Sequence, residues 1–164
     1  MNLPVRKPTR LKSYDYSTPG AYFITICAAG MKNYFSRINV GEVLAPPENI
    51  LSVYGKIVDR NIKALPQRYS HITVDKYVIM PNHIHLILVL KTGAASGSPT
   101  IIDAVRALKS LTVRECRENG FTAENLFQRS FHDHIIRSEN DYRMIWEYID
   151  TNVIRWEKDC FYTE

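Results

Sequence analysis

The segment Tyr77-Val-Ile-Met-Pro-Asn-His-Ile-His-Leu-Ile-Leu-Val-Leu90 contains two apolar runs that meet at Pro81-Asn82. Runs of this length predict two neighbouring β-strands joined by a tight turn. The second run carries His83 and His85, which are separated by one apolar residue. Because side chains alternate between the two faces of a strand, both imidazoles are expected to project from the same face. Two imidazoles held in this way can bind one divalent metal ion.

The composition is that of an ordinary soluble protein. The chain has 164 residues, of which 45% are hydrophobic and 23% are charged, as in a single globular domain. Its formal charge of +4 is compatible with a polyanionic partner, although many proteins without one share such a charge. Three widely spaced cysteines argue against a secreted disulfide framework. Without a signal-peptide pattern or an apolar run near the roughly 20 residues that span a bilayer, we expect a cytoplasmic protein with no membrane contact.

Hydrophobic periodicity and turn residues predict the other elements. Strands are expected over residues 21–29, 73–80, 83–90 and 126–137, with a short hairpin within 35–44. Helices are expected from Glu48 or Asn49 to about Leu65, from about Thr100 to Glu118, and from Glu139 to about Trp156. The order β-α-β-β-α-β predicts an α+β, ferredoxin-like antiparallel sheet followed by an additional C-terminal helix. The first and third strands, and with them the histidine pair, would lie at its centre.

Two regions contain cations that could contact nucleic acid. The proline-containing arm of residues 1–20 precedes a single domain expected over residues 21–164, and its cations are Arg6, Lys7, Arg10 and Lys12. Such an arm is either solvated or lies along a phosphate backbone. In the helix expected from Thr100, Arg106 and Lys109 fall opposite the apolar stripe. That face is either solvated or a second phosphate contact.

The last expected helix contains residues that could complete a site at the histidine pair. At about 100° per residue, Tyr148 lies off the centre of the apolar stripe, Asn152 follows one turn later, and Arg155 falls on the same flank as Tyr148. A tyrosine hydroxyl becomes a nucleophile when a nearby cation or base activates it. An asparagine carbonyl oxygen can be the third ligand of Mg²⁺ or Mn²⁺. The alternative is that Tyr148, one of ten tyrosines, only packs.

These motifs together carry a family resemblance. Met80-Pro-Asn-His-Ile-His85 followed by Tyr148-x-x-x-Asn152 resembles the single-tyrosine HUH transposases, in which HUH denotes His, hydrophobic residue, His. Within that family the chain is most similar to the REP-associated tyrosine transposases. The similarity extends over most of the chain, through Tyr14-Asp-Tyr-Ser-Thr-Pro-Gly-Ala-Tyr-Phe-Ile-Thr25 and the segment from Phe127 to Arg137.

The resemblance implies specific roles. His83, His85 and Asn152 would bind Mg²⁺ or Mn²⁺, and Tyr148 would attack single-stranded DNA at hairpin-forming repeats. The products would be a 5′-phosphotyrosine and a free 3′-hydroxyl, which rejoins strands by attacking the phosphotyrosine. Val153 stands where many members have proline, a difference at a helix end rather than at a ligand. His132, His134 and Arg155 are candidate DNA contacts, with packing an equal alternative for the two histidines. Members of the family are monomers or homodimers.

Two other functions are compatible with the sequence. One is a domesticated, non-catalytic nucleic-acid-binding domain on the same fold. The other is a metal-dependent hydrolase, which would need no tyrosine and would favour a carboxylate or a third histidine as ligand. The presence of His83, His85, Tyr148 and Asn152 together favours the strand transferase.

Overall fold

The computed structural model describes residues 14–39, 45–93 and 97–163, and a four-stranded antiparallel sheet forms its centre. The strand order is β4-β5-β1-β6. The bounds of these strands are β1 Gly20–Cys27, β4 Ile72–Ile79, β5 His83–Leu90 and β6 His132–Ile136. The predicted ferredoxin-like order is therefore confirmed, and the first and third strands of that pattern, β1 and β5, are central.

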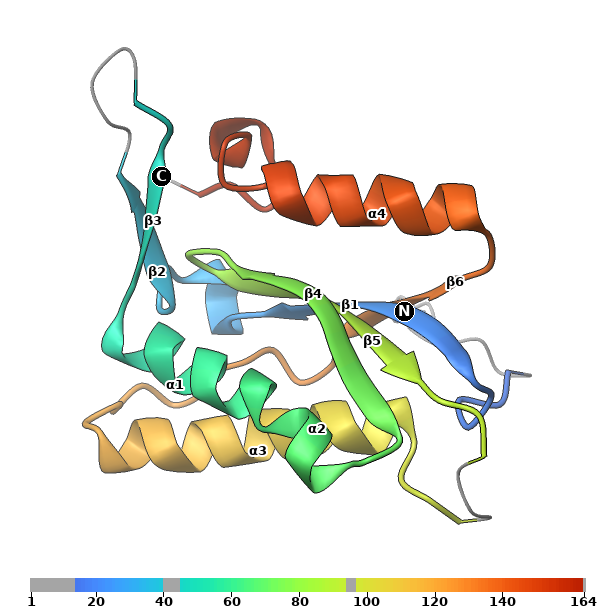
Figure 1. Cartoon of the computed structure of the whole chain (residues 1–164). Coiled ribbons are helices and arrows are strands. Elements are labelled where there is room, and N and C mark those ends of the chain that lie inside the picture. The colour runs from blue at the N-terminus through green and yellow to red at the C-terminus, as the bar shows by residue number, and fades with distance from the viewer. Residues whose placement is uncertain (1–13, 40–44, 94–96, 164) are drawn as a thin grey trace, which may run out of the picture.

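Helices cover both faces of the sheet (Figure 1). The helices are α1 Val53–Lys63, α2 Leu65–Arg68, α3 Ile101–Glu118 and α4 Glu139–Thr151, with short 3₁₀ turns at Ala29–Met31 and Trp156–Lys158. Helices α1 and α3 pack against each other beneath one face, whereas α4 lies across the other face over β4 and β5 (Figure 1). None of the described helices is long and apolar enough to cross a membrane.

The alternation of β5 separates two environments. Ile84, Leu86, Leu88 and Leu90 point into the apolar core formed with α1 and α3, and all four are buried. Central strands buried on both faces read as continuous apolar runs, which explains the composition of this segment. His83 and His85 occupy the opposite face, which α4 covers.

Local capping fixes where the helices begin. Thr100 and Asp103 form a reciprocal capping box at α3, and the Ser138 hydroxyl accepts the Asp141 N–H at the start of α4. Both caps satisfy backbone donors that have no partner within the first turn. Gly120, with φ at 88°, follows α3 in the left-handed conformation that favours glycine.

The segment before α1 differs from the sequence prediction. Glu48–Leu51 is strand β3, which pairs with β2 Ser36–Asn39, so a helix beginning at Glu48 or Asn49 is wrong. The hairpin predicted within 35–44 contributes only its first arm, and residues 40–44 lie outside the described residues. The helix begins after Ser52, whose hydroxyl accepts the Gly55 N–H, a stronger start signal than the prolines upstream.

The predicted strand over 126–137 and the predicted last helix are both too long. Only His132–Ile136 forms strand β6. Phe127 makes an isolated bridge to Ala28, and the Lys109 ammonium donates to the carbonyl oxygens of Gln128 and Arg129 at 2.7 and 3.1 Å. Helix α4 ends at Thr151, and the chain continues through a turn to the 3₁₀ segment Trp156–Lys158. The end of the predicted arm also belongs to the fold, since Tyr16 is buried and donates to Asp133 at 2.6 Å.

Candidate active site

The histidine pair is buried at the centre of the sheet. His83 and His85 are 0% and 1% exposed, and their ring centroids lie 4.4 Å apart. Burial lowers the pKa of His83 to about 4, although the Asp159 carboxylate acts in the opposite direction. Burial, followed by repulsion from His83, lowers the pKa of His85 well below its usual value. Both rings are therefore neutral at pH 7, the state in which imidazole binds a metal ion.

Asn82 sets the tautomer of His83. The Asn82 amide nitrogen donates to the carbonyl oxygen of Phe161 at 2.8 Å and lies 3.3 Å from that of Met31. Its Oδ1 is thereby oriented to accept a hydrogen bond from His83 Nδ1 at 2.8 Å. Nδ1 then carries the ring proton, and Nε2 presents a lone pair. Buried, with no hydrogen-bond partner among the described residues, Nε2 has the character of an open ligand position.

Thr25 and Tyr148 contact the two nitrogens of His85. Thr25 Oγ1 lies 2.9 Å from Nδ1, and the Tyr148 hydroxyl lies 3.2 Å from Nε2. If a cation binds Nε2, the ring proton lies on Nδ1, where it can be donated to Thr25 Oγ1. This contact depends on register, because Thr25 on β1 stands directly opposite His85 on β5.

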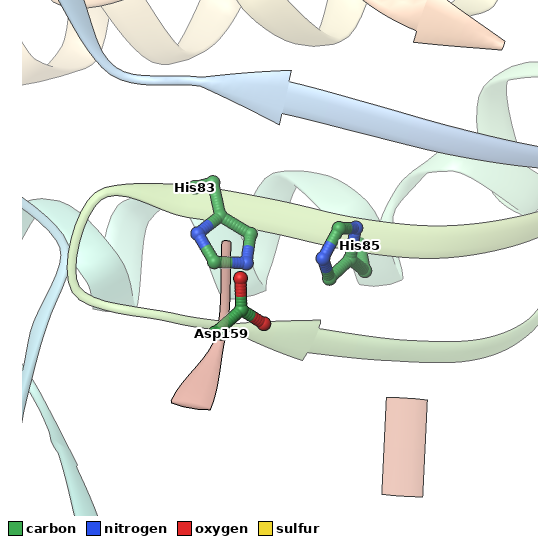
Figure 2. Close-up of side chains that lie close together, drawn as sticks. All are labelled: His83, His85 and Asp159. Carbon is green, nitrogen blue, oxygen red and sulfur yellow. The ribbon is translucent and has the colours of Figure 1, made fainter. Parts of the chain in front are cut away.

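The Asp159 carboxylate completes a possible metal site. One ligand atom from each of His83, His85 and Asp159 can be chosen so that all lie within 4.8 Å of one another. Figure 2 shows the two imidazoles projecting from β5 toward the carboxylate. Asp159 was missed in the sequence because a helix running to Trp156 gave no reason to place the following residues at the sheet. The only signal was a carboxylate, a preferred ligand of hard cations, a few residues beyond the predicted Tyr–Asn pair.

Asn152 reaches the same site from the end of α4. It is 1% exposed, and its Nδ2 donates to Asp159 Oδ2 at 2.7 Å. Its Oδ1 is buried without a hydrogen-bond partner among the described residues. This oxygen and His83 Nε2 are two buried donor atoms that would help to hold a divalent cation. The donor set of imidazole nitrogens with amide and carboxylate oxygens therefore fits the predicted Mg²⁺ or Mn²⁺.

Tyr148 lies beside the pair on the inner surface of α4. Its hydroxyl donates to Asp159 Oδ2 at 3.1 Å, and its ring packs 5.2 Å from that of His85. Burial and the Asp159 charge raise the pKa of Tyr148 above its ordinary value of 10, so the phenol is protonated at neutral pH. It can act as a nucleophile only if a base or a cation assists the loss of its proton.

The other predicted contacts are spread over the molecule. Arg6, Lys7, Arg10 and Lys12 lie outside the described residues. Arg106 pairs with Asp103 at 3.6 Å, and both it and Lys109 lie on α3, across the sheet from the histidines. The Lys109 ammonium donates to the carbonyl oxygens of Gln128 and Arg129, and its contact with a phosphate stays a prediction.

The two histidines of β6 lie on the face of the histidine pair. His132 stands opposite Thr25, and His134 opposite Phe23, so their side chains project to the face that carries His85. His132 is exposed there, whereas His134 hydrogen-bonds Asp141 at 2.8 Å. Arg155 is exposed in the turn after α4. The structure thus brings His83, His85, Asn152 and Tyr148 together. Of the other candidates that it describes, Arg106, His132, His134 and Arg155 are exposed.

Comparison with known proteins supplies the family and the fold. No protein-family model matches the chain. An uncharacterized protein of Haemophilus influenzae is 31% identical over 176 residues, covering 97% of this chain and 94% of that protein. A REP-associated tyrosine transposase bound to a REP hairpin superimposes with a TM-score of 0.59 at 20% identity, over 89% of this chain and 74% of that one. The chain belongs to the family of the Haemophilus influenzae protein and has the tyrosine transposase fold.

A second solved structure agrees with this assignment. It comes from Deinococcus radiodurans, is described as a candidate transposase, and matches with a TM-score of 0.50 at 17% identity. The match covers 87% of this chain and 95% of that one. The resemblance to the tyrosine transposases is thus confirmed in the fold.

Proposed function

We propose that the protein cleaves and rejoins single-stranded DNA at hairpin-forming repeats, with Tyr148 as the nucleophile and a divalent cation held by the histidine pair. The observation that carries this proposal is the position of the Tyr148 hydroxyl, 3.2 Å from His85 Nε2 and 3.1 Å from Asp159 Oδ2. A nucleophile beside a set of metal ligands is the arrangement that phosphodiester attack requires. The solved relative is bound to a REP hairpin, which supports a hairpin substrate.

His83 and His85 would hold the cation, with Asn152 or Asp159 as oxygen ligand. When bound, Mg²⁺ or Mn²⁺ polarises a phosphoryl oxygen and stabilises the charge that develops on it. Both rings are neutral and can bind a cation without losing a proton, and Asn82 sets the tautomer of His83 that leaves its Nε2 lone pair available.

The chain's residues account for bond making and for the proton. The Tyr148 oxygen attacks the phosphorus, the bond from phosphorus to the 3′-oxygen breaks, and that oxygen leaves as a 3′-hydroxyl after taking up a proton. Asp159 Oδ2, already accepting the Tyr148 hydrogen bond, is positioned to take the phenolic proton. Attack of a 3′-hydroxyl on the phosphotyrosine reverses these steps and regenerates Tyr148. One ester replaces another, so no external energy source is required.

One observation favours a second candidate, the domesticated domain that binds nucleic acid without cleaving it. The Phe161 ring lies 4.6 Å from the His83 ring, and the Phe161 carbonyl oxygen accepts a hydrogen bond from the Asn82 side chain. With both histidines almost fully buried, a phosphate reaches them only if the residues after α4 move. If the residues after α4 stay in place, the protein would bind a hairpin and leave it intact.

A labelled DNA hairpin with single-stranded flanks, incubated with Mn²⁺ or Mg²⁺, separates the two candidates. The transferase is expected to form a protein–DNA adduct that survives denaturing electrophoresis and disappears in Tyr148→Phe. Tyr54→Phe is the matched control, because that tyrosine packs against Phe121 at 5.2 Å beneath the opposite face of the sheet. If Tyr148→Phe forms as much adduct as the wild type, the assignment of Tyr148 as the nucleophile is wrong. Hairpin binding without an adduct across varied flanks supports the binding domain.

A further inference from the structure

A surface hollow lies between the β2–β3 hairpin and the turn that follows α4. Its volume is about 310 Å³, and it is lined by Ile38 and Pro47 from the hairpin side and by residues 153–158. The volume falls within the range of small-ligand pockets. Because its two walls come from segments more than a hundred positions apart in sequence, no local pattern indicates it.

The hollow adjoins the candidate active site through Trp156. This side chain lines the hollow, and its ring also packs 6.0 Å from that of His83. Tyr162 packs edge-on against the same indole at 5.3 Å and is 39% exposed. A strand whose phosphate lies at the histidine pair therefore has an aromatic and apolar surface one side chain away.

The lining combines two kinds of group that single-stranded nucleic acid needs. Ile38, Pro47 and Val153 are apolar, and Ile154 leaves 66% of its surface exposed at the same place. Arg155 and Lys158 are exposed cations at the hollow, and neither forms an ion pair with another described residue. Among the described residues of the lining, Glu157 is the one acidic residue. Apolar walls accept the face of a base, while arginine and lysine attract the adjoining phosphate.

We propose that this hollow binds the base of one unpaired nucleotide close to the scissile phosphate, with Arg155 and Lys158 attracting its backbone. The proposal rests on the proposed function for the position of the strand and adds a site that selects where the strand is cut. A single base held beside the active site fixes the register of the strand, so that one phosphodiester bond lies at Tyr148. In this proposal, the DNA group that Arg155 contacts is the backbone phosphate of the bound nucleotide.

Hairpin substrates with one abasic nucleotide, moved stepwise through each single-stranded flank, test the hollow. Affinity is measured by fluorescence anisotropy with Tyr148→Phe protein, so that the result does not depend on cleavage. Removal of the base at one position is expected to weaken binding about tenfold, the effect of losing one stacked base. Base removal at the other flank positions should have a smaller effect. Equal affinities at all positions would overturn the proposal.

Two variants connect the abasic effect to the hollow. Ile38→Trp fills the space, and Ile154→Asp places a carboxylate beside the expected phosphate at an exposed position where folding tolerates it. Each variant should bind the intact substrate as weakly as the protein with an unmodified hollow binds the abasic substrate. In each variant, removal of the base should then cause no further loss of affinity. Val53→Trp, at a 59% exposed position on α1, is the matched control and should retain the effect. Retention of the effect in both hollow variants would place the base elsewhere.

The adduct assay run on the same substrates separates this proposal from the one on which it rests. An adduct that forms equally with every abasic substrate, together with equal affinities, refutes the hollow alone. A position-dependent affinity without any adduct retains the hollow as a base-binding site and refutes the transferase.

Discussion

The two faces of β5 carry different kinds of structure on one strand. On one face, Leu86 and its apolar neighbours pack into a continuous core with α1 and α3. On the other, His83 and His85 are equally buried, but their nitrogens are oriented by Asn82 and Thr25 or left open. Apolar packing tolerates exchange of similar side chains, whereas a buried polar group needs a specific partner. Substitutions on the core face should therefore change mainly the free energy of unfolding. Substitutions on the histidine face should change mainly the rate of adduct formation.

The helices that cover the two faces are held in different ways. Helix α4 buries only Ile149, and it contacts the edge strand β4 through polar groups. Tyr142 donates to Asp75, and Lys76 pairs with Asp150 while lying 3.6 Å from the centre of the Trp146 ring. Polar contacts at a surface contribute little stability individually. Tyr148 thus stands on a helix whose contacts with the edge strand are mainly polar.

The largest effect is expected from removal of either histidine. His83→Ala or His85→Ala should lower adduct formation by at least about 100-fold, because the cation loses a ligand and its position. Chelation of the metal in wild-type protein should do the same, and added Mn²⁺ should restore activity. His71→Ala, which removes a ring bonded to the Pro99 carbonyl oxygen, is the control. Calorimetric titration with Mn²⁺ measures the site directly, and unchanged binding in His83→Ala would place the metal elsewhere.

A change on the core face should separate stability from chemistry. Leu86→Ala removes a fully buried side chain that directly follows His85 in the sequence and points to the opposite face of β5. The free energy of unfolding should fall by about 2–5 kcal/mol, the range for such cavities. Urea unfolding measures this loss, and the adduct rate should stay near wild type at temperatures where the variant is folded. A folded Leu86→Ala protein without activity would show that the two faces are not independent.

The smallest effect is expected from the polar contacts of α4. Lys76→Met removes the ion pair with Asp150 and the cation above Trp146, and should lower the free energy of unfolding by no more than about 1 kcal/mol. The adduct rate at saturating DNA should fall several-fold while DNA affinity is retained, because Tyr148 is held less firmly. Lys76→Arg should restore the rate. A rate unchanged in Lys76→Met would show that other contacts position the helix.

Several elements could be predicted from the sequence because their signals are local. The length and apolar composition of β5, the helix starts near Thr100 and at Glu139, and the turn at Pro81-Asn82 are all determined by residues close by in the sequence. The residues of strand β3 were assigned to a helix because four residues are too few to show the alternation of a strand. Its partner β2 is separated from it in the sequence by residues 40–44.

The candidate site was predicted in part for the same reason. Two histidines on one strand, and a tyrosine and asparagine one helical turn apart, follow from periodicity. Asp159 could not be placed, because it reaches the rings only after the chain turns back beyond Thr151. Nor could the orientation of Asn82, which depends on the Phe161 carbonyl oxygen, far away in the sequence.

Identification of the residue that becomes linked to DNA tests the central claim most directly. Trypsin cleaves after Arg143 and Arg155, and the peptide between these sites contains Tyr148 as its only tyrosine. After reaction with the hairpin and nuclease trimming, mass spectrometry should find the 5′-phosphate of the nucleotide remnant on this peptide. A remnant on a peptide with another tyrosine, or on none, would contradict the assignment of Tyr148 as the nucleophile.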